Sequence, residues 1–404
     1  MKLRNWLHAV CLILAAASLL TSRPVALLVQ AGEPPPRVVA IGDIHGAFDS
    51  FTGLLKRLEL IDERQRWIGG NSILVQTGDF LDRGPGERPL MDLLRDLPKQ
   101  AEKAGGRVIV LLGNHEVMNL IGDFRYVPAE GFESFSNSGS ARKRERALQQ
   151  YLRHLNRQAS SRNDPILDSQ DGVRQAWLEE HPEGFIERME AFSSGEYGKW
   201  LRRLPAVARV EDSLFLHGGV HPDLSSYSPE EINRRIAQEL RLFDRYRRYL
   251  ERHQVVLPFF TLSEMELAVH RELELARSRS QQALSGLMPE NSDENQHIQI
   301  LEAFLSSVNW WIRHPDGPLW FRGYATWPEE GEEVDSRIDR LLDAFSVRRL
   351  VVGHTPMLED GVQGRFGGRI FLTDTGMLSS YYPGGRASAL VIEKGSVQTV
   401  SLDP

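Results

Sequence analysis

Five short polar motifs carry the side chains of this sequence that are best suited to chemistry. In chain order they are GDIHG at 42–46, GDFLDRG at 78–84, GNHE at 113–116, HGG at 217–219 and GHTP at 353–356. Carboxylates, imidazoles and amides are ligands that first-row divalent metal ions accept. The second motif adds an arginine to its two carboxylates. The residue types therefore predict a metal-binding site.

Taken one at a time, these motifs have ordinary structural explanations. Gly-Asp after a strand is often a turn, a histidine beside glycine is often hydrogen-bonded in a loop, and a lone arginine is usually solvated. All five motifs, however, follow separate predicted strands, which favours one shared site. Asp43 and His45 stand two residues apart at a strand end, so their side chains project to the same side and form a pair of metal ligands.

The first third of the chain alternates strand-like and helix-like segments. Apolar, largely β-branched runs lie at 37–41, 72–76 and 107–112, and helical spacing occupies 48–60 and 89–104. This alternation predicts a largely parallel sheet with helices on its faces. Ligands of such sheets bind beyond the carboxyl ends of the strands, which is where the motifs fall.

Two polar, helix-rich stretches at about 129–200 and 228–312 interrupt this series. We interpret both as helical insertions in one α/β domain that covers 37–404. Strand-like segments return later in the chain, at 206–210, 214–216, 348–352, 369–372, 387–393 and 396–402. This second set of strands is what a β-sandwich would need.

The overall composition is that of an ordinary globular protein. Of 404 residues, 41% are hydrophobic and 25% are charged, which excludes a disordered chain. The formal net charge of −7 argues against a nucleic-acid partner bound through a broad basic surface.

The first 31 residues have the layout of a secretory signal peptide. Lys2 and Arg4 precede an apolar core at 10–20, and residues 29–31 resemble a small-residue cleavage site. We expect export to the periplasm or the medium, with a membrane anchor as the alternative if the segment is not cleaved. Residues 32–36 would form a linker. The only cysteine, Cys11, lies in the apolar core, so cleavage would leave no thiol to bind metal.

In this order, the five motifs resemble the signature of the phosphoprotein phosphatase family of calcineurin-like metallophosphoesterases. The stretches LLGNHEVMNLIGDFRYV at 111–127 and HGGVHPDL at 217–224 resemble one branch, the Shewanella-like protein phosphatases. The resemblance covers roughly 37–128, 204–235 and 316–378. It implies an α/β fold, a metallophosphatase-type β-sandwich of two mixed sheets flanked by helices (α/β/β/α), with helical insertions.

The resemblance also implies a site with two divalent metal ions, Mn²⁺ first, with Fe or Zn²⁺ as alternatives. One ion would be held by Asp43 and His45, and Asp79 would bridge both ions. The second ion would be completed by Asn114, His217 and His354. In this family a metal-bridging hydroxide attacks phosphorus, so no phosphoenzyme is required.

Four further residues would handle the phosphate and the leaving group. Arg83 and Arg322 would bind phosphate oxygens, since a guanidinium fork matches two of them. His115 would be the general acid, and Asp82 would fix its tautomer and raise its pKa. Asn114 and His115 would thereby also contact the substrate.

The resemblance leaves three functions open. The first is a metal-dependent phosphomonoesterase, a protein phosphatase acting on phosphorylated proteins or peptides. The alternatives are a small-molecule phosphohydrolase, such as a dinucleoside polyphosphate hydrolase, and a non-catalytic phosphate-recognition domain. We take His221 as structural, whereas Tyr381, Tyr382 and Arg386 could either grip substrate or cap the last strands.

Overall fold

The computed structural model describes residues 36–162, 171–284, 292–358 and 361–402. The predicted export segment at 1–31 and nearly all of the predicted linker at 32–36 lie outside these residues. Within the described ranges, no helix combines the length and the apolar character needed to cross a membrane.

The first of two five-stranded sheets has the strand order β10-β9-β1-β2-β3. Its strands are β1 (Val38–Ile41), β2 (Ile73–Gln76), β3 (Arg107–Val110), β9 (Ser388–Glu393) and β10 (Ser396–Ser401). β1, β2 and β3 run parallel, whereas β9 pairs antiparallel with both β1 and β10. The parallel part is the one that the first third of the sequence predicts.

The second sheet has the order β4-β5-β6-β8-β7. Its strands are β4 (Val207–Val210), β5 (Ser213–Leu216), β6 (Arg349–Val352), β7 (Gln363–Arg365) and β8 (Ile370–Leu372). β5, β6 and β8 are parallel, and β4 and β7 close the two edges in antiparallel fashion. Both sheets are therefore mixed, as predicted.

Alternate residues of the strands belong to two different cores. Val38 and Ala40 of β1 share one apolar cluster with Phe215 of β5 and Val351 of β6, so this cluster joins the two sheets. Val39 and Ile41 belong instead to the larger cluster that includes the helices. Side chains of a strand alternate between its faces, and here both faces are buried. The predicted α/β/β/α layering is confirmed.

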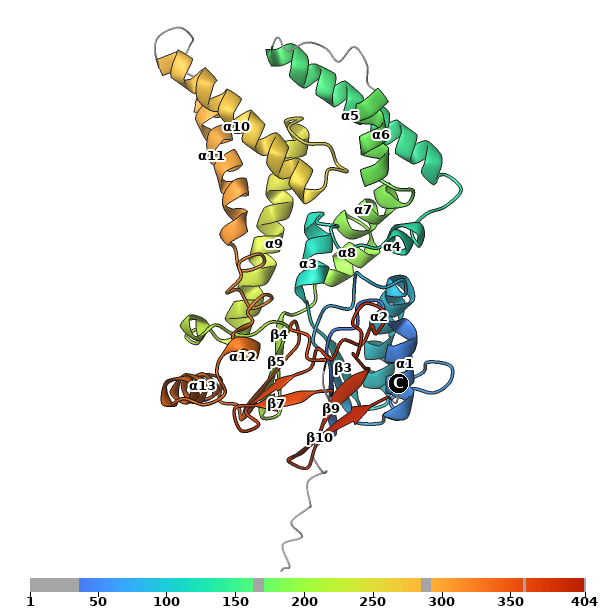
Figure 1. Cartoon of the computed structure of the whole chain (residues 1–404). Helices are drawn as coiled ribbons and strands as arrows, with labels where there is room; N and C mark the ends of the chain where they lie inside the picture. The colour runs from blue at the N-terminus through green and yellow to red at the C-terminus, as the bar shows by residue number, and fades with distance from the viewer. Residues whose placement is uncertain (1–35, 163–170, 285–291, 359–360, 403–404) are drawn as a thin grey trace, which may run out of the picture. The chain divides into compact units, whose positions relative to one another are not determined.

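The helices that flank the sheets include α1 (Phe48–Arg57), α2 (Glu87–Lys103) and α13 (Glu332–Phe345). α1 and α2 make the crossovers between the parallel strands of the first sheet (Figure 1). α3 (Asn114–Ile121) follows β3 and is buried along its whole length. It begins at the carboxyl end of the sheet, and this end carries the predicted site.

Most of the remaining helices form two segments that interrupt the sheet strands. The first segment comprises α4 (Ala129–Glu133), α5 (Ser140–Arg162), α6 (Asp171–Glu180), α7 (Phe185–Ser193) and α8 (Glu196–Leu201). The second comprises α9 (Pro229–Arg252), α10 (Leu262–Leu284) and α11 (Ser292–Leu305). Ser228 and Glu231 form a capping box at the start of α9, with Pro229 in the first turn.

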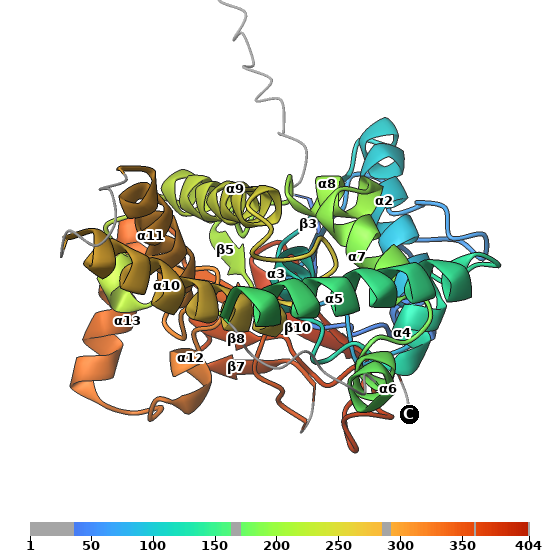
Figure 2. The ribbon, with the colours of Figure 1, turned by 90° about the horizontal axis from the view of Figure 1, so that it is seen from above.

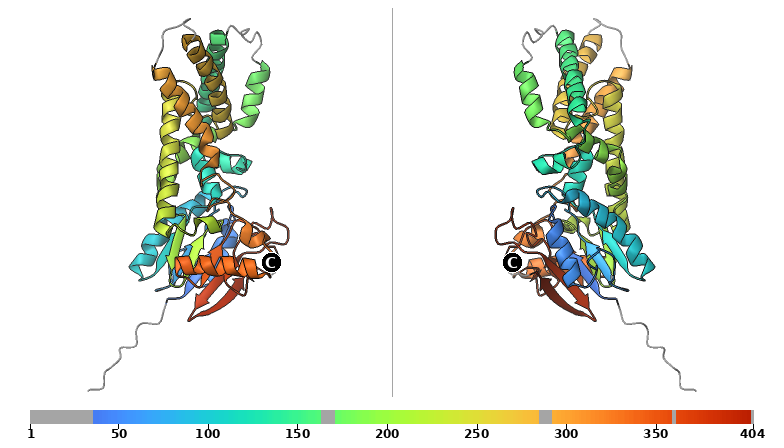
Figure 3. Two further views of the ribbon diagram at one scale, coloured as in Figure 1. Left: turned by 90° about the vertical axis from the view of Figure 1, so that its left-hand side faces the viewer. Right: turned by 90° about the vertical axis from the view of Figure 1, so that its right-hand side faces the viewer.

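Both helical segments lie on the side of the sheets from which α3 rises (Figures 1 and 3). Seen from above, α5, α9 and α10 lie over the strands (Figure 2). Tyr151 and His154 of α5 pack against Phe260, just before α10, so the two segments touch each other as well.

Candidate metal centre and active site

The six predicted metal ligands come together at the carboxyl ends of the strands. Each of them is at most 5% exposed. They follow β1, β2, β3, β5 and β6, so five strand ends from both sheets build one cluster. The cluster members are Asp43, His45, Asp79, Asn114, His217 and His354.

Three of these residues surround the Nε2 atom of His217. This nitrogen lies 3.1 Å from Asp79 Oδ2, 2.9 Å from Asn114 Oδ1 and 3.1 Å from His354 Nδ1. The opposite nitrogen of each histidine faces a backbone carbonyl: His217 Nδ1 faces that of Thr77, and His354 Nε2 that of Trp320. Because these two nitrogens donate to the carbonyls, the other ring nitrogens, His217 Nε2 and His354 Nδ1, keep their lone pairs. Metal-binding histidines are arranged in this way.

Asp43 and His45 lie on the other side of Asp79. His45 Nε2 is 3.7 Å from Asp43 Oδ2 and 3.9 Å from Asp79 Oδ2, and His45 Nδ1 lies 2.8 Å from the Leu81 carbonyl oxygen. Asp79 is thus common to both groups, as a bridging ligand would be. His115 also has a ring nitrogen 3.8 Å from Asp79 Oδ2.

The charges in this cluster fit a cationic ligand. Burial, and next the carboxylates of Asp374 and Asp79, raise the pKa of Asp43 well above its ordinary value. Burial also raises the pKa of Asp374 to about 6, and its Oδ2 atom has no hydrogen-bond partner among the described residues. Buried carboxylates without compensation are costly. Divalent ions among these oxygen and imidazole ligands would remove that cost.

Asp374 is a residue that the sequence prediction missed. It follows β8 in the stretch Thr373-Asp374-Thr375-Gly376, one more acidic residue just beyond a strand end. The same pattern that singled out Asp43 and Asp79 could therefore have found it. Its position beside Asp43 places it at the edge of the predicted metal centre.

Two glycines permit the close packing of the ligands. A Cβ on Gly353 would lie 2.3 Å from Asp43 Oδ1, and one on Gly113 would lie 2.1 Å from Asp79 Oδ1. His45, Asp79 and His354 themselves have positive φ angles of 47°, 54° and 71°. Such backbone strain in non-glycine residues is held by surrounding structure and gathers at functional sites.

Glu116 supplies part of that support. Its buried carboxylate accepts hydrogen bonds, with N···O distances of 2.8–3.1 Å, from the backbone N–H groups of Asp79, Phe80, Leu81 and Gly113. Burial, and then the charge of Asp79, raise the pKa of Glu116 to about 8, while the N–H groups lower it. One side chain thus fastens the loop of the second motif to that of the third.

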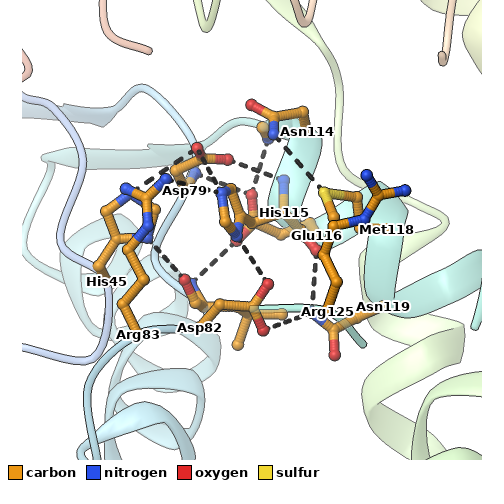
Figure 4. Close-up of polar contacts among 12 residues, drawn as sticks. His45, Asp79, Asp82, Arg83, Asn114, His115, Glu116, Met118, Asn119 and Arg125 are labelled. Carbon is orange, nitrogen blue, oxygen red and sulfur yellow. Dashed lines mark hydrogen bonds and ion pairs between the residues drawn. The ribbon is translucent and has the colours of Figure 1, made fainter. Parts of the chain in front are cut away.

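The predicted acid and its partner are in hydrogen-bond contact. His115 Nδ1 lies 2.6 Å from Asp82 Oδ2, and both side chains are at most 2% exposed (Figure 4). Burial lowers the pKa of His115, but Asp79 and the hydrogen bond to Asp82 outweigh it, so the net shift is upward. The Asp82 bond fixes Nδ1–H and directs Nε2 towards Asp79 and Arg83.

Arg83 lies at the centre of an aromatic group. Its guanidinium is 5.1–5.6 Å from the ring centroids of Tyr126, Tyr381 and Tyr382, and it donates to the Tyr382 hydroxyl. It also lies 2.5 Å from His45 Nε2. One lone pair cannot serve both Arg83 and a metal ion, so ligation by His45 requires the guanidinium to turn away.

The remaining predicted residues lie around this centre. Arg322 is exposed beside His354 and donates to the His354 carbonyl at 2.8 Å and to Thr355 Oγ1 at 3.1 Å. His221 accepts a hydrogen bond from Asp223 N at 3.3 Å and packs on Phe321, in keeping with a structural role. Arg386 pairs through its backbone with Thr375, next to Asp374.

Arg188 of α7 also reaches this site, although nothing in its sequence surroundings indicates it. The side chain is fully buried and donates to Glu87 at 2.5 Å, to Asn119 Oδ1 at 2.7 Å and to Asp82 Oδ1 at 3.3 Å. The rings of four phenylalanines lie 4.9–5.8 Å from its guanidinium. The first helical segment is thereby tied to the carboxylate that holds His115.

The fold and the cluster of ligands define a metallophosphoesterase-type domain. The chain belongs to the calcineurin-like phosphoesterase family, whose sequence profile matches residues 36–358. The family prediction made from the five motifs is confirmed.

Two relatives carry the name of the branch that the sequence resembles. Shewanella-like protein phosphatase 2 of Arabidopsis thaliana is 34% identical over 215 residues, which are 50% of this chain and 51% of that protein. Shewanella-like protein phosphatase 1 of Plasmodium berghei is 26% identical over 368 residues, which are 91% of this chain and 74% of that protein. The chain thus spans about half the length of the first of these relatives.

A solved structure shares the fold. A cold-active protein-tyrosine phosphatase of a psychrophilic Shewanella species superposes with a TM-score of 0.54 at 22% identity, over 91% of this chain and 81% of that one. This similarity supports the architecture of two sheets with helical segments.

Proposed function

We propose that this chain is a metal-dependent phosphomonoesterase that acts on phosphorylated proteins or peptides. The observation that carries the proposal is the convergence of two ligand groups on Asp79, beside a guanidinium and a histidine–carboxylate pair. A phosphate monoester needs groups of this kind: cations for its charge, a donor for its oxygens and an acid for its leaving group.

Two divalent ions, Mn²⁺ in our proposal, would be held by Asp43 and His45 on one side and by Asn114, His217 and His354 on the other, with Asp79 shared. When bound, such ions polarise the phosphoryl group and activate water. Arg83 would bind two phosphate oxygens once it has turned from His45, and Arg322 would reach the phosphate from the opposite rim. Both roles exploit the planar guanidinium fork.

His115 would donate the proton that the leaving oxygen needs. Asp82 accepts the hydrogen bond from Nδ1–H, so the Nε2 atom, which faces Asp79 and Arg83, would carry the transferable proton. The upward shift in the pKa of His115, caused by Asp79 and the hydrogen bond to Asp82, favours the protonated ring. The hydrogen bond to Asp82 stabilises the charged imidazolium.

Aromatic residues around Arg83 favour a phosphotyrosine side chain among the monoesters. Tyr126 and Tyr381 are 41% and 50% exposed and flank Arg83, so they offer ring surfaces to an aryl phosphate. The names of the relatives, two protein phosphatases and a protein-tyrosine phosphatase, support the same substrate class. Export by residues 1–31 stays part of this proposal.

The test is turnover by the purified chain without residues 1–31, with Mn²⁺ and with chelator. Substrates would be p-nitrophenyl phosphate, phosphotyrosine and phosphoserine peptides, and a dinucleoside tetraphosphate. Metal-dependent release of phosphate from the peptides would support the proposal, with phosphotyrosine preferred. Cleavage of the dinucleotide alone would assign a nucleotide hydrolase, and metal binding without turnover would leave a recognition domain.

A further inference from the structure

A cavity lies where the two helical segments meet. Its volume is about 430 Å³, and it is lined by Phe132 and by residues from three stretches of chain: 122–125, 180–185 and 261–266. Tyr126, the residue that follows the first stretch, packs on His115 at a ring distance of 5.1 Å. The cavity lining therefore adjoins, through Tyr126, the residue proposed as the acid.

The cavity wall is acidic above an apolar floor. Four carboxylates, those of Asp123, Glu180, Glu264 and Glu266, face one arginine, Arg125. The floor is formed by Phe124, Phe132, Phe185 and Leu262. A ligand with a positive head and an apolar stem matches both features, because its stem packs on the rings while its head meets the carboxylates.

Not all four carboxylates are equally open to a ligand. Asp123 is paired with Arg125 at 2.7 Å, and Glu266 is paired with Arg313 at 2.7 Å. Glu264 caps α10 by accepting from Thr261. Glu180 is exposed at the end of α6, so its charge is the one most readily offered to a ligand.

A buried histidine in the wall presents an unpaired acceptor. His181 is 1% exposed, and its Nδ1 atom donates to the Trp177 carbonyl oxygen at 2.8 Å. Its Nε2 atom has no hydrogen-bond partner among the described residues, and Glu264 Oε2 lies 3.5 Å from it. Because Glu264 Oε2 already accepts from Thr261, the Nε2 atom of His181 is the acceptor of this pair that is suited to an incoming N–H group.

The His181 ring is held firmly in this orientation. Trp177 stacks on it at 4.2 Å with an interplanar angle of 8°, and Phe185 meets it edge-on at 4.4 Å. The lone pair is thus fixed in place before a ligand arrives, which reduces the entropy cost of binding.

We propose that this cavity is a substrate subsite that takes an arginine or lysine side chain near the phosphorylated residue. The head group would donate to His181 Nε2 and Glu264 and would meet the charge of Glu180. This inference rests on the proposed function, since it names a feature of the phosphopeptide substrate.

The test is a phosphotyrosine peptide library in which one arginine is moved along both flanks, with citrulline as the uncharged isostere. Values of kcat/KM would be compared for the full mature chain, for Glu180→Gln and for His181→Phe, which keeps an aromatic ring. Glu179→Gln is the matched control, because Glu179 is a neighbouring exposed carboxylate that does not line the cavity.

We expect arginine at one position to raise kcat/KM about twofold to fivefold over citrulline, the range of a partly exposed ion pair. Glu180→Gln and His181→Phe should abolish that preference, and Glu179→Gln should keep it. Hydrolysis of p-nitrophenyl phosphate should not change in any variant. Equal rates for arginine and citrulline at every position would overturn the subsite while leaving the peptide-phosphatase proposal intact. No peptide turnover at all would overturn both.

Discussion

Replacing Arg188 with methionine should destabilise the protein and weaken the proposed acid together. Arg188 is the basic side chain that contacts the fully buried carboxylates of Glu87 and Asp82, and all three side chains are 0% exposed. Methionine has a comparable apolar stem but no charge. The change therefore removes the cationic partner of Glu87 and leaves Asp82 with its hydrogen bonds from His115 and Asn119.

The expected cost follows from that geometry. Removing one partner of a buried ion pair typically costs about 3–5 kcal/mol. A whole domain has only about 5–15 kcal/mol of stability, so Arg188→Met should lie near the edge of folding at 37 °C. Arg188→Lys keeps the charge but cannot bond Glu87, Asn119 and Asp82 at once, so its loss should be intermediate.

The pH dependence has a definite sign. Burial raises the pKa of Glu87, and the charge of Arg188 opposes this shift. A raised folded-state pKa means that folding binds a proton, so stability falls as pH rises from the unfolded value through the folded one. Without Arg188 the folded pKa rises further. The Arg188→Met penalty should accordingly be larger at pH 8 than at pH 5.

Urea unfolding at both pH values measures these differences. A double variant with Glu87→Gln is the control: glutamine keeps an oxygen for the backbone N–H of Asp82, 2.6 Å away, but carries no charge. It should recover part of the stability and remove the pH dependence. A penalty under 1 kcal/mol, or one equal at pH 5 and pH 8, would refute the buried-pair reasoning. In parallel, Arg188→Met should slow alkyl phosphates more than aryl ones, because Asp82 positions His115.

Four further predictions concern the site itself. His115→Asn should slow alkyl phosphates far more than aryl phosphates, because a phenolate leaves without a proton; equal losses in kcat would contradict its role as acid. Mn²⁺ should raise the thermal midpoint of the chain without residues 1–31 and of its His115→Asn variant but not of its Asp79→Asn variant, and EDTA should reverse the increase. Gly353→Ala should abolish this effect of the metal, because the added Cβ would lie 2.3 Å from Asp43 Oδ1. A calorimetric titration with Mn²⁺ that matches the parent's would contradict this prediction. Glu116→Gln should lower the free energy of unfolding by about 1–3 kcal/mol for each backbone N–H that is left without an acceptor. A midpoint of urea unfolding equal to the parent's would rule this out.

The ligand cluster could be predicted from the sequence because each ligand is specified locally. In four places, at β1, β2, β3 and β6, a short apolar strand is followed by a glycine and then a polar residue. Parallel strands bring their carboxyl ends to one edge of a sheet, so these polar residues meet. The bounds of the predicted strands were right to within two residues, as with 348–352 against Arg349–Val352 for β6, but the short edge strand β7 was not predicted. The helix predicted at 89–104 contains Pro98, and α2 accommodates this proline in its interior.

Arg188 could not be predicted, because its role depends on contacts between distant parts of the chain. Its partners Glu87 and Asp82 lie 101 and 106 residues earlier. In sequence it stands among charged residues of a helix, where an arginine is normally solvated. Only the packed structure shows that this face of α7 is turned inward. The acceptor of His181 was hidden for the same reason.

These two features change the interpretation of the helical segments, which from sequence alone could only be expected to shape the opening of the cleft. One of them contributes Arg188 beneath the Asp82–His115 pair, and both contribute walls to the acidic cavity beside Tyr126. A segment that supports the proposed acid from behind cannot be exchanged without affecting catalysis. A segment that forms only the cavity wall can be changed with effects limited to substrate choice. Arg188→Met and Glu180→Gln separate these two consequences within the same helical segment, since the first should alter kcat on every alkyl phosphate and the second only the selection among peptides.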